Sequence, residues 1–473
     1  MAAPGRFTQG SIMSHIAVMT STASVGLMAL FLVDLADLYF LSLLGEAEVA
    51  AAVGFSGSIL FFSTSICIGI AIAMSALVSL AIGGGKRQRA RRSVVNVFVF
   101  GVLITIPLAT AMWLAVPWML RLLGAEGYTL ELAISYLRIV LPSMPILVMG
   151  MSCGGALRAV GDAKGAMYTT LAGGAVNAIF DPLFIFALAM GVDGAATASV
   201  LGRFAVLAVG LRGVIRQESL LTTFSFRAFR RQTWAIVKIA GPAMMTNVAT
   251  PIGYAFVTAS IARFGDGAVA GYAVVGRIIP VAFGIVFALS GAVGPIFGQN
   301  FGAGLPERVR RTFWDGLIFS AAAVFAVSII LYFCQGLLIH AFDLDGEAAD
   351  LVAFFATFVA VTFVFNGAQF MANAAFNNLQ HPDWSTWSNW ARATIGTIPF
   401  VWLGAELAGA PGVLAGQALG GLLIALLTVG AALTLLRRLP ERPPPGSSAQ
   451  TSFRVPLSPY TLYRGWVGIF SRD

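Results

Sequence analysis

The sequence predicts an all-α polytopic membrane protein, with twelve transmembrane helices in two six-helix lobes related by a pseudo-two-fold axis along the membrane normal. Three observations lead to this fold class: the composition, the length of the apolar runs and an internal repeat. Of the 473 residues, 58% are hydrophobic and 11% are charged, against about 25% charge in a typical soluble domain. This composition excludes a soluble globular fold, a disordered chain and a coiled coil. Unbroken apolar runs of about twenty residues also exclude a transmembrane β-barrel, whose strands alternate over about ten residues.

Apolar runs separated by charge clusters and Gly/Pro turns predict twelve helices. They lie near residues 12–44, 48–83, 94–122, 131–159, 165–190, 192–216, 235–263, 267–301, 312–341, 348–379, 384–406 and 411–437. Several exceed the roughly 20 residues that cross the hydrocarbon core, so we expect these helices to tilt, kink or project beyond it. The N-terminus lacks the short apolar segment and small-residue cleavage site of a signal peptide, so the first run is expected to remain as a span.

Lysine and arginine are distributed unevenly between the predicted loops. If the N-terminus is cytoplasmic, the inner loops and tails hold 23 of the 29 basic residues and the outer loops hold two, Arg121 and Arg263. The positive-inside rule therefore predicts cytoplasmic termini and a multi-pass protein of the plasma membrane, the inner membrane of a bacterium. Basic clusters such as Lys86–Arg92 have no interleaved aromatic residues for base stacking, so no nucleic-acid partner is expected despite the net charge of +8.

Three loop motifs of the first half recur in the second half at nearly constant spacing. The pairs are offset by 219, 220 and 218 residues and are Gly83–Ser93 with Gly302–Thr312, Leu44–Ala50 with Phe264–Ala270, and Gly191–Gly202 with Gly409–Gly420. Because each repeat holds an even number of spans, both halves keep the same membrane orientation, which requires an axis along the membrane normal. Parallel repeats of this kind place a substrate path between the two lobes.

The repeat also sets the expected domain boundaries. We expect an N-terminal lobe at 1–216, a cytoplasmic linker at 217–234, a C-terminal lobe at 235–438 and a Pro- and Ser-rich cytoplasmic tail at 439–473.

Cysteine and histidine offer no cofactor chemistry. The three cysteines lie far apart inside apolar runs, and no histidine has a ligand partner at helical spacing. We therefore expect no disulfide, no metal site and no cofactor, with only a coupling ion, H⁺ or Na⁺, to bind. A monomer is the expected oligomeric state.

Carboxylates inside spans are costly and suggest function. Four fall in predicted spans: Asp34, Asp37, Asp181 and Asp315. Asp315 follows a basic cluster by three residues, so we expect it to form an ion pair at the membrane interface. Asp37 lies eight residues from Gly45 at the outer end of the first helix, and Asp181 lies about nine from the outer end of the fifth. At 1.5 Å rise per residue, each is about 12 to 14 Å below that surface.

The equal depth of Asp37 and Asp181 predicts that these carboxylates meet within one lobe. Asn177 lies four residues before Asp181 on the same helical face, and the hydroxyl of Ser199 supplies a further oxygen. Asp34 shares a face with Asp37. Such a cluster can take a proton or hold a hard cation through oxygen ligands. The alternative is a hydrogen-bonded network that only fixes helix packing.

Four arginines also fall inside predicted spans: Arg138, Arg203, Arg277 and Arg392. Arg203 and Arg277 are deep enough to need carboxylate or carbonyl partners. Arg138 and Arg392 are shallower and can extend to the interface. For all four, a structural ion pair is favoured over a substrate contact.

Five motifs resemble those of the multidrug and toxic compound extrusion (MATE) transporters. They occur in order within about residues 12 to 438 and are DLYFLSLLGEAEVAAAVGF (Asp37–Phe55), ALRAVGDAK (Ala156–Lys164), NAIFDPLFIF (Asn177–Phe186), GVDGAATAS (Gly191–Ser199) and FGQNFGAG (Phe297–Gly304). The resemblance implies two six-helix lobes, alternating access, and export driven by inward flow of Na⁺ or H⁺.

Within that family the chain looks most like the branch typified by the DNA-damage-inducible protein F group. There, a first-helix Asp and an Asn-x-x-x-Asp-Pro on the fifth helix form a cation site in the N-terminal lobe. Asp37, Asn177 and Asp181 occupy those positions, and Ser199 stands where a sixth-helix hydroxyl is usual. The resemblance therefore implies a cation-coupling site at these four residues.

Two features depart from the family pattern. The other bacterial branch carries a Glu on the seventh helix, whereas Ile236–Phe264 contains no carboxylate and only polar groups such as Asn247 and Thr250. Asp34 stands where an Asn is common. We therefore treat Asp34, Asn247 and Arg277 as accessory groups of the cavity, outside the coupling site itself.

The residues and the resemblance together predict a secondary-active antiporter that exports amphipathic, cationic small molecules or drugs in exchange for H⁺ or Na⁺. The nearest alternative is a flippase for lipid-linked intermediates of the same superfamily, although such proteins often have fourteen helices. A membrane-embedded enzyme is disfavoured, because no His-Glu-x-x-His occurs and the acidic stretch Asp343–Asp350 lies in an outer loop. The major facilitator fold and a channel are further alternatives, but the matched motifs belong to neither.

Overall fold

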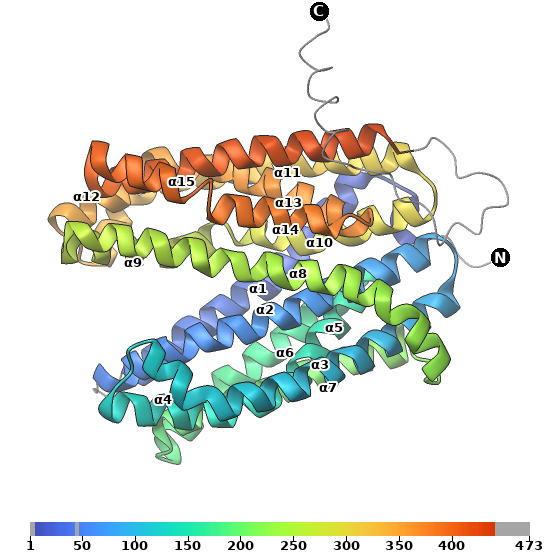
Figure 1. The fold of residues 1–473 in the computed structure, drawn as a ribbon, viewed down its shortest axis with the longest axis horizontal. Helices are drawn as coiled ribbons and strands as arrows, with labels where there is room; N and C mark the ends of the chain where they lie inside the picture. Colours follow the sequence, from blue (N-terminus) through green and yellow to red (C-terminus); the bar gives the residue numbers. More distant parts are fainter. Residues whose placement is uncertain (1–4, 43–46, 440–473) are drawn as a thin grey trace, which may run out of the picture. The chain divides into compact units, whose positions relative to one another are not determined.

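The computed structural model of the chain describes residues 5–42 and 47–439 (Figure 1). Every regular element within these residues is a helix, which confirms the all-α class. Helices satisfy their own backbone hydrogen bonds, as a chain in lipid must. The predicted tail at 439–473 lies outside the described residues except for Leu439, and so does part of the loop motif Leu44–Ala50.

The helices follow the predicted runs closely. The first half contains α1 (Ile12–Ser42), α2 (Ala47–Gly83), α3 (Arg87–Leu122), α4 (Gly127–Val140), α5 (Met144–Val160), α6 (Ala163–Pro182) and α7 (Gly191–Arg212). The second half contains α8 (Phe226–Ile261), α9 (Asp266–Ala282), α10 (Gly284–Gly302), α11 (Pro306–Ala341), α12 (Gly346–Phe354), α13 (Phe363–Asn378), α14 (Pro382–Ala393) and α15 (Ile398–Arg437). Short 3₁₀ or π segments join several of them.

Ten segments of the described chain are long and apolar enough to cross a membrane. The last, Pro382–Arg437, covers 56 residues and contains a non-helical break at Ala408 and Gly409, so it holds two of the predicted spans. The long helix α8 occupies the seventh predicted span, and α9 followed by α10 occupies the eighth. The chain is therefore a twelve-helix membrane protein.

The helices form two compact units. One contains Thr22–Ile82 and Lys86–Asn247, and the other contains the residues up to Ser21, Gly83–Gly85 and the residues from Val248 on. Packing therefore groups the start of α1 with the C-terminal helices and the first two-thirds of α8 with the N-terminal helices. The domain boundaries at 1–216, 217–234, 235–438 and 439–473 rest on the sequence repeat and stay a prediction.

Each unit has its own apolar core. In the N-terminal helices it is built from buried residues of α2, α3 and α5, including Ile70, Met74 and Leu157. In the C-terminal helices it includes Phe283 and Phe363, whose rings stack with centroids 4.2 Å apart. In this second unit α11, α13 and α15 run side by side (Figure 1).

The repeat is visible in the backbone as well as in the loops. A 3₁₀ turn at Leu141–Ser143 interrupts the fourth span, and another at Ala360–Thr362 interrupts the tenth, at an offset of 219 residues. Gly161 and Gln380 share the same offset, and both have positive φ, of 91° and 70°. The left-handed conformation at each position ends a helix before the next span begins. Both halves are therefore folded to the same local plan.

Candidate functional site

The predicted coupling residues of the fifth span lie on the face of α6 that packs against α7. The N-terminus of α6 is fixed by Asp162, whose Oδ1 accepts a hydrogen bond from the backbone N–H of Gly165 at 2.9 Å. Further along, a Cβ at Gly173 would lie 2.6 Å from Cγ2 of Val206 on α7. Glycine at this position lets the two helices approach closely. Asp181, near the end of α6, is fully buried.

Asn177 lies directly over a glycine of the neighbouring helix. A Cβ at Gly202 would overlap Oδ1 of Asn177, so the carboxamide occupies the space left by the missing side chain. This Oδ1 atom is buried and accepts no hydrogen bond from any described residue. A buried acceptor without a donor costs about 1–3 kcal/mol. The oxygen is therefore available for a cation, a water molecule or a protonated carboxyl group.

Ser199, the predicted hydroxyl ligand of the sixth span, lies at the same height along the helices as Asn177 and Asp181. Gly202 packs against Asn177, and Gly194 packs against the backbone of Phe184, so α6 and α7 run antiparallel. This register places the partly buried Ser199 between the levels of Asn177 and Asp181. The structure thus brings three of the four predicted coupling residues to one stretch of the α6–α7 pair.

The fourth predicted residue, Asp37, lies in α1, and its side chain is outside the described residues, as is that of Asp34. The backbone register of α1 is nevertheless defined by its glycine contacts with α6. A Cβ at Gly26 would lie 3.3 Å from Cβ of Thr170, and a Cβ at Gly174 would lie 3.3 Å from Cγ2 of Val33. The helices therefore run parallel, and the offsets of 144 (Gly26 to Thr170) and 141 (Val33 to Gly174) place position 37 level with residues 178–181.

The accessory residues have other surroundings. Nδ2 of Asn247 donates to the carbonyl of Ala243 in its own helix at 2.7 Å. The expectation of a buried partner for Arg277 is wrong, because its side chain is exposed on α9. No hydrogen bond or ion pair joins Arg277 to another described residue.

Two other predictions for charged residues can be compared with the structure. Arg203 donates to the carbonyl of Val140 at 3.1 Å and to Oγ of Ser143 at 2.8 Å, which confirms its carbonyl partner. Asp315 forms the predicted interfacial ion pair, with Arg311 at 3.5 Å.

Ion pairs were the wrong expectation for the four arginines within the spans. None of them pairs with a carboxylate within the described ranges. Arg138 is exposed and lies 5.1 Å from the ring centroid of Trp113, so it is held by a cation–π contact instead.

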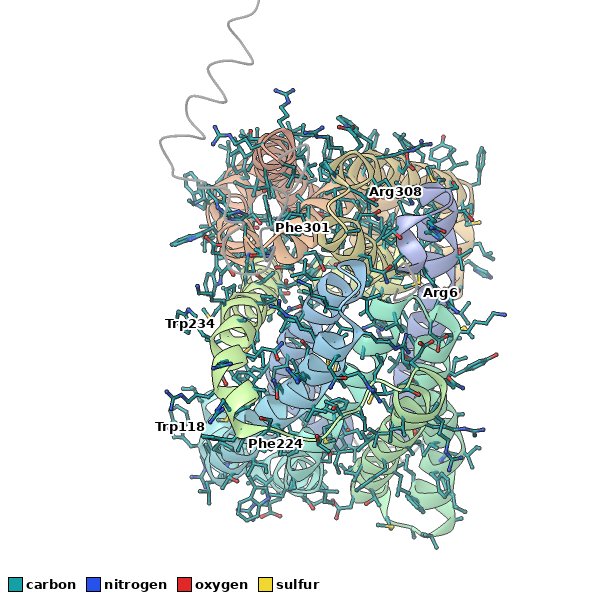
Figure 2. All side chains as sticks on the ribbon, turned by 90° about the vertical axis from the view of Figure 1, so that its right-hand side faces the viewer. Arg6, Trp118, Phe224, Trp234, Phe301 and Arg308 are labelled. Carbon is teal, nitrogen blue, oxygen red and sulfur yellow. The ribbon has the colours of Figure 1, made fainter. Side chains whose placement is uncertain are left out.

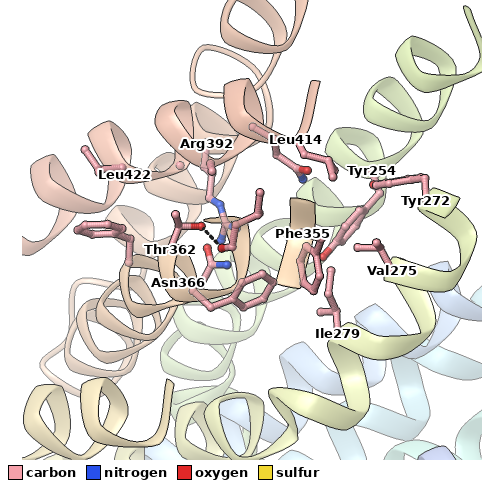
Figure 3. Close-up of a pocket in the computed structure, with 16 residues that line it drawn as sticks. Tyr254, Tyr272, Val275, Ile279, Phe355, Thr362, Asn366, Arg392, Leu414 and Leu422 are labelled. Atoms are coloured by element: carbon pink, nitrogen blue, oxygen red, sulfur yellow. Dashed lines mark hydrogen bonds between the residues drawn. The ribbon is translucent and has the colours of Figure 1, made fainter. Parts of the chain in front are cut away.

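Sequence reasoning missed the role of Arg392. This arginine stands at the end of α14 and points into a pocket of the C-terminal helices, between Thr362 and Asn366 (Figure 3). Tyr254 and Tyr272 line its other side. The signal was the repeat itself: Arg392 is offset by 219 residues from Gly173, so one half has an arginine where the other has a glycine.

Two helix breaks meet at this pocket. A π segment at Phe355–Val359 and the 3₁₀ turn at Ala360–Thr362 separate α12 from α13, and both contribute lining residues. The chain also leaves helical geometry over residues 394–397, between α14 and α15. Breaks of this kind in membrane helices frequently mark binding sites, because they free backbone groups and redirect side chains.

The motif FGQNFGAG (Phe297–Gly304) and the nearby Arg308 bind the N-terminal segment. Oε1 of Gln299 accepts a hydrogen bond from the backbone N–H of Phe7 at 3.0 Å. Arg308 donates to the carbonyl of Phe7 at 2.9 Å, to that of Gly10 at 3.0 Å and to Oδ1 of Asn300 at 2.9 Å. Figure 2 shows Arg308 and the segment that carries Arg6 at the same end of the helices. This basic loop therefore holds a peptide segment in addition to any topological role.

Comparison with known proteins gives a family match over most of the chain. A family model described as MatE matches residues 23–183 and 242–403. A protein described as FAD transporter from Shewanella oneidensis is 27% identical over 85% of this chain and 90% of its own. The probable multidrug resistance protein YpnP of Bacillus subtilis is 25% identical over 76% and 83%, respectively. The multidrug export protein MepA of Staphylococcus saprophyticus is 21% identical over 77% and 81%.

Solved structures share the fold. The Vibrio cholerae MATE transporter VcmN superposes with a TM-score of 0.86, covering 90% of this chain and 97% of that chain at 24% identity. A MOP superfamily transporter from Pyrococcus furiosus superposes with a TM-score of 0.85, covering 93% and 99% at 21% identity. At these identities the likeness concerns the fold alone.

Proposed function

This chain belongs to the MatE family, and we propose that it is a secondary-active antiporter that exports amphipathic, cationic small molecules in exchange for H⁺ or Na⁺. The family is one of multi-pass membrane transporters, and the chain is not an enzyme. One observation carries the antiport proposal. The fully buried Asp181 lies one helical turn from Asn177, whose buried Oδ1 has no donor among the described residues.

The coupling chemistry follows from this arrangement. A carboxylate in an apolar bundle is stabilised by a bound cation or by a proton, and either one removes its negative charge. The amide oxygen of Asn177 and the hydroxyl of Ser199 are hard oxygen ligands that suit Na⁺, and they equally accept hydrogen bonds from a protonated carboxyl. The backbone register that relates position 37 to position 181 supports Asp37 as the second carboxylate of this site.

Alternating access would use this local change. Neutralising the site alters the hydrogen bonds between α1, α6 and α7, and the close contacts at glycines between these helices transmit a small displacement from one helix to the next. The cation and the substrate then favour different states of the N-terminal helices. This differential affinity is the energetic requirement for exchange.

The deciding experiment is dye efflux from inverted vesicles, driven separately by a sodium gradient and by a proton gradient. We expect Asp37→Asn and Asp181→Asn to abolish coupled efflux, because an amide cannot neutralise a bound cation or release a proton. Asp34→Asn should be milder. Asp315→Asn is the matched control, since Asp315 pairs with Arg311 at 3.5 Å outside the site. Wild-type efflux in both site variants, inserted at normal levels, would refute the coupling role.

A second candidate substrate class is favoured by one relative. The protein described as FAD transporter covers 85% of this chain, more than the multidrug proteins YpnP and MepA. FAD is an anionic, aromatic molecule, unlike the cationic dyes of the first proposal. Competition of unlabelled FAD against dye efflux separates the two substrate classes, because a cation-selective path would be insensitive to FAD.

For the protein's location we propose the bacterial inner membrane, with both termini cytoplasmic and the chain monomeric.

A further inference from the structure

Each half of the chain has one arginine near its helix break, Arg203 in the N-terminal half and Arg392 in the C-terminal half, and the two have different partners. In the N-terminal half, Arg203 comes from α7 and donates to the carbonyl of Val140 and the hydroxyl of Ser143. Ser143 itself donates to the carbonyl of Val140 at 2.7 Å. This guanidinium group is thus held by the broken backbone and has a structural role.

In the C-terminal half, the break has the same hydrogen bond but a different arginine. Thr362 donates to the carbonyl of Val359 at 2.6 Å, and both residues are offset by 219 from their N-terminal counterparts. At the offset of 218 that relates Gly191–Gly202 to Gly409–Gly420, Gly421 stands at the position of Arg203, and the arginine comes instead from α14, as Arg392. Its Nε would lie 3.9 Å from a Cβ at Gly421, an ordinary van der Waals distance, so the two residues are neighbours.

The guanidinium of Arg392 has no hydrogen-bond or ion-pair partner in the described chain, and the group that it interacts with electrostatically is the phenol of Tyr254. No hydrogen bond or ion pair reaches it, and the same holds for the side-chain amides of Asn366 and Gln417, which line the same pocket. No aspartate or glutamate is among the lining residues. A cation within a protein interior is costly unless it is paired. The pocket thus contains the positive charge of Arg392 and the side-chain amides of Asn366 and Gln417, with no carboxylate among its described lining residues.

We propose that this pocket binds an oxyanion, the phosphate or carboxylate group of a small amphipathic molecule. The planar guanidinium of Arg392 pairs with two oxygens at once, which is the geometry that arginine offers to phosphate and carboxylate. Asn366 and Gln417 donate to the remaining oxygens. The aromatic rings of Tyr254 and Phe363 line the pocket beside these groups and can stack on or contact the rest of the molecule.

This site lies in other helices than the coupling carboxylates and does not depend on which cation drives transport. Each half then has one charged site of opposite sign. At the positions offset by 219 from Asn177 and Asp181 the C-terminal half has Gly396 and Phe400, so it has no acidic site of its own. Both halves therefore share the helix breaks, but the N-terminal half carries the carboxylates and the C-terminal half carries the unpaired arginine.

A matched pair of fluorescent probes tests the proposal. Riboflavin 5′-phosphate and riboflavin share one ring system and differ in a single phosphate group. In purified protein, quenching of flavin fluorescence should give a dissociation constant at least ~10-fold lower for the phosphate, as expected for charge-assisted hydrogen bonds to Arg392. Equal affinities in the wild-type protein would overturn the proposal.

Two variants locate the effect. Arg392→Gln removes the charge, and we expect the ratio of the two affinities to fall to about one. Gln417→Glu is isosteric and gives Arg392 an internal carboxylate, so it should also remove the discrimination even if Arg392→Gln does not fold. The control is Arg437→Gln, which removes an exposed arginine at the end of α15, outside the pocket, and should leave the ratio unchanged. Discrimination retained in Gln417→Glu, or lost equally in the control, would refute the site.

Competition identifies the source of the oxyanion. Displacement of riboflavin 5′-phosphate by millimolar inorganic phosphate supports a site for the free anion. Displacement in nanodiscs of phosphatidylglycerol, but not of phosphatidylcholine, supports a lipid headgroup. If neither competes while the Arg392-dependent discrimination persists, the site recognises the phosphate as part of the larger molecule.

Discussion

Oδ1 of Asn177 occupies the space where a side chain at Gly202 would begin, so α6 and α7 are in close contact at these two residues. The contact joins the predicted coupling helix to its neighbour through an amide whose oxygen has no donor in the described chain. Any atom added at position 202 must therefore displace the amide from the site.

Gly202→Ala is expected to impair coupling without preventing insertion. The added methyl group would push Asn177 away and separate the helices, at a cost of about 1–3 kcal/mol. Coupled dye efflux should fall by about tenfold, because the oxygen cluster is disturbed. Gly276→Ala on α9 is the control, since a Cβ there would meet nothing within 4 Å. If Gly202→Ala exported dye at the wild-type rate, Asn177 would have no part in coupling.

Arg308→Lys is expected to loosen the N-terminal segment. A lysine ammonium group cannot replace the guanidinium that reaches Asn300 and the carbonyls of Phe7 and Gly10 together. We expect trypsin to cleave after Arg6 several-fold faster, and the midpoint of thermal unfolding to fall by roughly 2–4 °C. Arg437→Lys, at an exposed arginine, serves as control. An unchanged cleavage rate would show that Gln299 alone retains the segment.

Arg310→Ala tests the neighbouring basic residue. Its guanidinium donates to the carbonyls of Leu436 and Leu439, at 3.1 and 3.3 Å, and pairs with Glu307. These contacts satisfy carbonyls at the C-terminus of α15, where a cation is favourable. We expect lower thermal stability with unchanged substrate affinity, measured by dye binding to purified protein. A selective loss of affinity in well-folded protein would mean that this loop contacts substrate.

The topology prediction can be checked with single cysteines. In a background without Cys67, Cys153 and Cys334, a membrane-impermeant maleimide added to intact cells should label cysteine placed at Glu48 or Asp345. Cysteine placed at Arg89 should react only after the membrane is opened. The reverse pattern at either side would overturn the cytoplasmic placement of both termini.

The sequence by itself determined the features that depend on composition and local spacing. The all-α membrane fold follows from apolar runs, because lipid excludes unpaired backbone groups. The ion pair of Arg311 with Asp315 follows from spacing of four residues along one helix. The need of Arg203 for a polar partner follows from depth alone, since a deep cation must be paired wherever it lies, but the choice of a carbonyl over a carboxylate came from the structure.

Only the tertiary structure decided which faces meet. The sequence placed Arg277 deep and Arg392 near the interface, yet Arg392 points into a pocket and Arg277 is exposed, because the rotation of a helix about its axis depends on its neighbours. Arg308 contacts Phe7 across 301 residues, a pairing that no local spacing encodes. The helix breaks at residues 355–362 and 394–397 change the directions in which the following side chains point, and hydropathy does not predict these directions. Long-range packing therefore places Arg392, which the sequence put near the membrane interface, inside a pocket of the C-terminal helices.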